Sequence, residues 1–105
     1  MSSLPDAPEK AIKFMIQKAE TLAEVLEREN MALARNDAVS FAIAQQEKEH
    51  LAAEYETLAA AFAEKRQALL GANTVLLDRL EKAQQDLKSR AEDNTAMMER
   101  MQKKA

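Results

Sequence analysis

The sequence predicts an all-α protein, in which an antiparallel helical hairpin is extended by a third helix into a three-helix bundle or coiled coil. The chain of 105 residues contains one glycine, Gly71, and two prolines, Pro5 and Pro8, so little interrupts a helix after residue 6. Aromatic residues make up only 4% of it, which argues against a β-rich core. Apolar residues recur at alternating steps of three and four, the spacing of helices that pack along one stripe. At this length we expect one domain, residues 1–105.

The first helix is predicted at about residues 7–35. Residues 1–5 resemble a frayed tail. Asp6 is suited to cap the helix, Pro8 is tolerated in its first turn, and Glu9 stands three residues after the cap, as in a capping box. The apolar stripe consists of Ile12, Met15, Ala19, Leu22, Leu26 and Leu33, with the polar Glu29 in the same register.

The second helix is predicted at about residues 38–70. Asn36 tolerates the left-handed conformation that ends a helix, and Asp37 can cap the next one. The stripe that follows contains Phe41, Ala44, Lys48, Leu51, Tyr55, Leu58, Phe62, Lys65 and Leu69. A connection this short makes the two helices antiparallel, and we expect their stripes to pack against each other.

The third helix is predicted at about residues 73–103. Gly71 fits a helix C-terminus and Asn73 an N-cap. The alternative is one bent helix from Asp37 to the end of the chain, with Gly71 costing about 1 kcal/mol. The third stripe is apolar at first and then includes polar and methionine positions: Leu76, Leu80, Ala83, Leu87, Arg90, Asn94, Met97 and Met101. We therefore expect its second half to pack less well, or to pack against something else.

Two charged residues occupy positions of the stripes where the spacing predicts apolar residues. In a hairpin that turns at residues 36–37, Glu29 and Lys48 lie at nearly the same level. We expect them to form a partly buried ion pair, which adds little net stability but penalises slipped registers. In the alternative, each side chain turns outward to solvent independently.

The sequence does not favour an enzyme, a cofactor or a metal site. It has no cysteine, one glycine and one histidine, which leaves no phosphate-binding loop and no evident nucleophile–base pair. Glu47 and His50 match the Glu-x-x-His spacing of di-iron bundles, but such sites need two of these motifs and two further glutamates. A di-metal enzyme formed by dimerisation is therefore the least favoured alternative. We expect His50 to be a solvated residue beside the stripe.

Charge and hydropathy limit the classes of partner. The net charge of −3 arises from interspersed charges of both signs, which gives no basic footprint for nucleic acid. No apolar run is as long as a bilayer span, and the N-terminus lacks a signal-peptide pattern, so we expect no membrane insertion and a cytoplasmic location. A protein partner remains. Met98 and Met101 are candidates for its contact surface, because methionine adapts to irregular partners, whereas Met97 is expected in the core.

The predicted hairpin contains one further pattern of spaced residues: Leu26, Glu29, Ala32, Leu33, Asp37, Phe41, Ala44, Lys48 and Leu51. This pattern resembles the first helical hairpin of the FlgN-type flagellar export chaperones. Phe41 and Ala44 stand where the family has leucines. The segment from Lys65 to Gly71 and the residues Asn94, Met97 and Met98 are similar to two later family motifs, so that the resemblance covers roughly residues 20–98.

The resemblance implies a cytoplasmic chaperone that binds flagellar hook-associated proteins, which form the hook–filament junction, and delivers them to the type III export apparatus. No cofactor would be needed. An amphipathic helix of the client would lie on the apolar face of the last helix, near Leu87, Ala91, Met97, Met98 and Met101. The alternative is a structural coiled-coil scaffold or stalk protein whose stripes are used in permanent self-assembly. The sequence leaves open the oligomeric state, including a homo-oligomer, and the identity of the partner.

Overall fold

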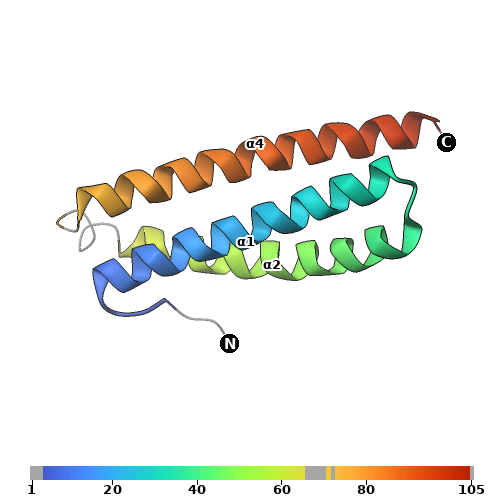
Figure 1. The fold of residues 1–105 in the computed structure, drawn as a ribbon. Coiled ribbons are helices and arrows are strands. Elements are labelled where there is room, and N and C mark those ends of the chain that lie inside the picture. The colour runs from blue at the N-terminus through green and yellow to red at the C-terminus, as the bar shows by residue number, and fades with distance from the viewer. Residues whose placement is uncertain (1–3, 66–70, 72, 105) are drawn as a thin grey trace.

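A computed structural model describes residues 4–65, 71 and 73–104 of the chain. These residues form three helices: α1 (Pro8–Ala34), α2 (Ala38–Glu64) and α4 (Thr74–Lys104). The helices lie alongside one another in a molecule of 50 × 26 × 17 Å, with α2 antiparallel to the other two (Figure 1). The predicted all-α class and three-helix bundle are confirmed.

Helix α1 is the central helix of the bundle. It packs extensively against both α2 and α4, whereas α2 and α4 contact each other only weakly. The cause is the width of the buried face of α1, where Ile16, Ala23 and Val25 are buried beside the expected stripe. The stripes of α1 and α2 pack against each other as expected, but not with each other alone, because α1 also packs against α4. Helix α2 fully buries only Ala44 and Leu58.

Two apolar clusters form the core along α1. One of them joins Ile12, Met15 and Ile16 to residues of α2 and α4, among them Leu58, Leu76 and Leu80. The other joins α1 to Leu87 of α4 and consists of Ala19, Leu22, Ala23, Leu26 and Leu87.

The N-terminal segment differs from its prediction in two ways. Leu4 is buried in the first cluster, so the segment expected to fray is anchored at that residue by its apolar side chain. The N-cap of α1 is Ala7 rather than Asp6, and no side chain caps the helix. The carboxylate of Asp6 instead lies 3.7 Å from the ammonium of Lys65, while Pro8 occupies the first turn as predicted.

The turn between α1 and α2 confirms its prediction. Asn36 has φ 56°, in the left-handed region, and the amides of Asn36 and Asp37 donate to the carbonyls of Leu33 and Ala32. This pair of bonds satisfies the last carbonyls of α1. The Asp37 carboxylate accepts hydrogen bonds from the amide and hydroxyl of Ser40, and these bonds lower the pKa of that carboxyl below its usual range.

The bundle has a second break where one was predicted, but α2 ends earlier than expected. Its last residue is Glu64 and Lys65 is its C-cap, while residues 66–70, including Leu69 of the predicted stripe, lie outside the described residues. Gly71 is exposed and does not have a positive φ. The Asn73 side chain accepts a hydrogen bond from the amide of Val75, as an N-cap does. The alternative of one bent helix is therefore wrong.

Candidate functional site: the groove between α2 and α4

A groove runs between α2 and α4, because these two helices pack on α1 rather than on each other. We call it the α2–α4 groove. Its volume is about 410 Å³, and it is lined by Leu22, Leu26, Lys48, Glu49, Ala52, Tyr55, Glu56, Leu87, Ala91, Asn94 and Thr95. The three leucines are nearly buried and form its floor. Ala52 and Ala91 stand on opposite walls, and their small side chains allow the backbone of another helix to approach closely.

Two polar bridges cross the groove from α2 to α4. The Gln84 amide donates to the Tyr55 hydroxyl at 3.2 Å. About two turns closer to the N-terminus of α2, the ammonium of Lys48 lies 3.4 Å from the side-chain oxygen of Asn94. Both bridges use long or exposed side chains, so they hold α4 close to α2 without closing the apolar floor between them.

The second bridge belongs to a buried polar network. The Lys48 ammonium lies 2.8 Å from Glu29 Oε1, which is the contact that the stripe positions predicted. Glu29 is fully buried, and its Oε1 also accepts from Asn94 Nδ2 at 2.7 Å. The same Nδ2 donates to Asn30. Oε2 of Glu29 has no hydrogen-bond partner among the described residues. The network therefore links all three helices at one level of the bundle.

Exposed glutamates stand along both sides of the groove opening. Glu49 and Glu56 belong to α2 and line the groove. Glu92 and Glu99 belong to α4 and line a shallow hollow that adjoins the groove at Ala91 and Thr95. Both pairs are separated by seven residues, so each pair lies on one face of its helix. No ion pair within the described residues uses any of the four carboxylates.

The residues predicted to bind a partner are divided between two places. Leu87 and Ala91 line the α2–α4 groove, although Leu87 is also part of the core. Met97, Met98 and Met101 are half-buried and lie outside the groove. Met101 lines a separate hollow of about 240 Å³ with Leu33 and Phe41, at the hairpin end of the bundle. The sequence did not reveal that α2 forms one wall of the groove. Ala52 and Tyr55 of this wall are half-buried, and their helical spacing is the same as that of core residues.

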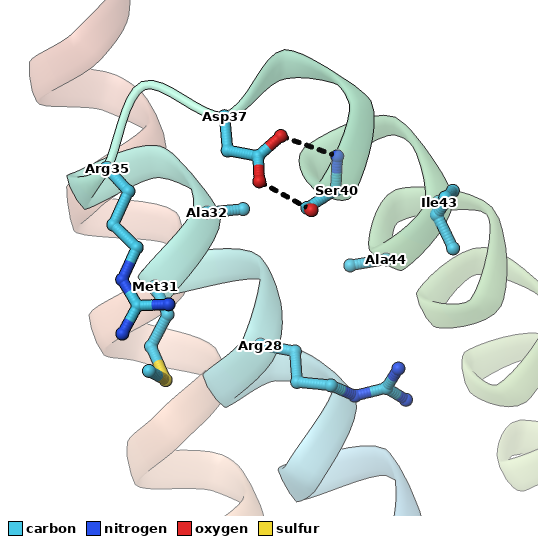
Figure 2. A pocket seen from close by; sticks show the side chains of 8 residues that line it. All are labelled: Arg28, Met31, Ala32, Arg35, Asp37, Ser40, Ile43 and Ala44. Atoms are coloured by element: carbon cyan, nitrogen blue, oxygen red, sulfur yellow. Dashed lines mark hydrogen bonds between the residues drawn. The ribbon is translucent and has the colours of Figure 1, made fainter.

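A third hollow lies beside the hairpin turn, and α4 contributes no residue to it. Figure 2 shows Ala32 and Ala44 between α1 and α2, with Arg28, Met31 and Arg35 projecting from α1 and Ile43 from α2. Arg28 forms an ion pair with Glu47 at 2.6 Å, and this contact raises the pKa of the Arg28 guanidinium. Met31, Ile43 and the nearby Val39 are largely exposed, so this end carries apolar surface.

Glu47 and His50, the Glu-x-x-His pair of the sequence, both lie on α2. His50 is exposed on α2, and the Glu47 carboxylate faces Arg28. Within residues 4–65, 71 and 73–104, no three histidine, cysteine or acidic side chains are gathered as metal ligands. In the same part of the chain, no helix has the length and apolar character needed to cross a membrane.

A comparison of the chain with protein-family models, with curated proteins and with solved structures finds no match.

Proposed function

We propose that the protein is a cytoplasmic export chaperone that binds an amphipathic helix of a flagellar hook-associated protein in the α2–α4 groove. The observation that carries the proposal is the packing of α2 and α4 on α1 but hardly on each other. In a four-helix bundle each helix contacts two neighbours, so this arrangement leaves open the position diagonal to α1. A client helix in that position would cover the leucine floor.

The groove suits reversible binding better than permanent assembly. The Lys48–Asn94 and Tyr55–Gln84 bridges cross it from α2 to α4. A client must compete with these bridges, and its release restores them. The resemblance of the hairpin to the FlgN-type chaperones supplies the client class, and delivery to the type III export apparatus follows from that resemblance.

A binding measurement with one substitution on the α2 wall tests the proposal. Ala52→Gln fills the space that a docked helix needs, whereas Ala53→Gln places the same side chain at an exposed neighbour that does not line the groove. We expect Ala52→Gln to weaken binding of a purified hook-associated protein at least about tenfold, the equivalent of ~1.4 kcal/mol. Ala53→Gln should bind like the unmodified chain, and the thermal unfolding of both variants should confirm that they fold.

The proposal is contradicted if the unmodified chain does not bind hook-associated proteins. It is also contradicted if both variants bind equally well, since the client would then lie elsewhere.

A structural coiled-coil scaffold is the second candidate, and one observation favours it. Met31, Val39 and Ile43 are largely exposed at the hairpin end, where they give self-association an apolar surface. A scaffold would sediment as a stable oligomer at low micromolar concentration. A chaperone of the kind proposed would remain monomeric until its client is added.

A further inference from the structure

We infer that the α2–α4 groove selects amphipathic helices whose apolar stripe is flanked by lysine or arginine. This inference rests on the proposed function and names the chemistry of the client. It follows from the charges at the groove opening, which the resemblance to a chaperone family does not address.

Negative charge predominates on the two sides of the groove opening. The residues that line the groove and its adjoining hollow include four glutamates, at positions 49, 56, 92 and 99, and two lysines, Lys48 and Lys88. Lys48 is already paired with the buried Glu29. The four carboxylates have no such partner within the described residues. The opening therefore has an excess of negative charge that a client can neutralise.

The glutamates on the two sides of the groove have the same spacing along their helices. Glu49 and Glu56 are one heptad apart on α2, about 10 Å along the helix axis. Glu92 and Glu99 repeat that spacing on α4. A helix that lies in the groove places its own flanking positions beside these two rows at the same interval, as the charged positions of a coiled coil do. Lysine or arginine there would form ion pairs, and glutamate would be repelled.

A buried carboxylate lies next to two residues that line the groove. Glu29 is fully buried and its Oε2 lacks a hydrogen-bond partner in the described part of the chain, next to Lys48 and Asn94, which line the groove. A buried carboxylate oxygen without a donor is costly. A donor from the client that displaces the Lys48–Asn94 bridge would reach this network, whereas a client carboxylate would add a second negative charge to it. The floor and the two sides thus favour the same kind of client.

Two synthetic three-heptad helical peptides with one identical apolar stripe test the inference, one flanked by lysines and the other by glutamates. Fluorescence anisotropy with the full chain should show that the lysine peptide binds at least tenfold more tightly, and that added salt reduces the difference. The double variant Glu49→Lys/Glu56→Lys should remove this preference. The control variant Glu81→Lys/Asp93→Lys changes the net charge by the same amount. Both of its positions are exposed on α4 and line neither the α2–α4 groove nor the hollow that adjoins it, so this variant should keep the preference for the lysine peptide.

Equal binding of both peptides, or tighter binding of the glutamate peptide, would overturn the inference. So would a control variant that loses the preference as fully as the groove variant, because net charge alone would then explain it. Binding of a hook-associated protein to the same preparations separates the two proposals. If that protein binds and the peptides show no preference, the inference fails and the proposed function stands.

Discussion

At the scale of single residues, Glu29, Lys48 and Asn94 form a polar network where the apolar stripes of the three helices are interrupted. The Glu29–Lys48 pair could be predicted from the sequence, because both residues interrupt an apolar stripe at matching distances from the turn. Asn94 could not be assigned to the same network, because a polar residue in a weakening stripe is equally consistent with an exposed helix face. In the structure the side-chain oxygen of Asn94 accepts from Lys48 of α2. Its amide nitrogen donates to Glu29 and Asn30 and so joins α4 to α1.

Removing Glu29 alone should destabilise the protein, and removing the pair should not. Glu29→Leu leaves the Lys48 ammonium beside an apolar side chain, and because Lys48 retains some access to solvent we expect a loss of about 1–3 kcal/mol in the free energy of unfolding. The double variant Glu29→Leu/Lys48→Leu should be close to the unmodified chain or more stable, because no buried charge is left unpaired. Urea unfolding measures both values.

The exposed Arg28–Glu47 pair serves as the control for this prediction. Arg28→Leu should cost less than about 1 kcal/mol, because that pair remains in solvent. If Glu29→Leu proves no more destabilising than Arg28→Leu, the pair is not buried in the way the structure shows.

At the scale of elements, the sequence predicted each helix but not which helix is central. The turn at Asn36 and Asp37 was predictable because its chemistry is local: one residue in the left-handed conformation and one carboxylate that caps the next helix. The central place of α1 depends on Ile16, Ala23 and Val25, which widen its buried face beyond one stripe. Those residues are visible in the sequence, but only the packing of α2 and α4 shows that both sides of the stripe are used.

The two halves of α4 should differ in stability. The buried residues of its first half are leucines, Leu76, Leu80 and Leu87. The buried residue of its second half, among those described, is the polar Asn94. Because buried apolar contacts protect backbone amides from exchange, we expect amides after Leu87 to exchange faster than those of residues 77–87 in the same helix. Hydrogen exchange on the isolated protein measures this difference. Uniform protection along α4 would favour the scaffold over the chaperone.

For the whole molecule, the central feature is that α2 and α4 both pack against α1 and leave the α2–α4 groove between them. This groove has an apolar floor and glutamates on both sides. The hairpin end carries the separate apolar surface of Met31, Val39 and Ile43, which shares no residue with the groove. A bound client and a self-associating contact would therefore affect different parts of the chain.

An NMR titration of the full chain with the helix of a hook-associated protein tests the central claim most directly. The account predicts that the methyl signals of Ala52, Ala91 and Leu26 shift as the client is added, while those of Val39 and Ile43 stay unchanged. Shifts confined to Met31, Val39 and Ile43, with Ala52 and Ala91 unaffected, would contradict it, because the partner would then bind the hairpin end and leave the α2–α4 groove empty.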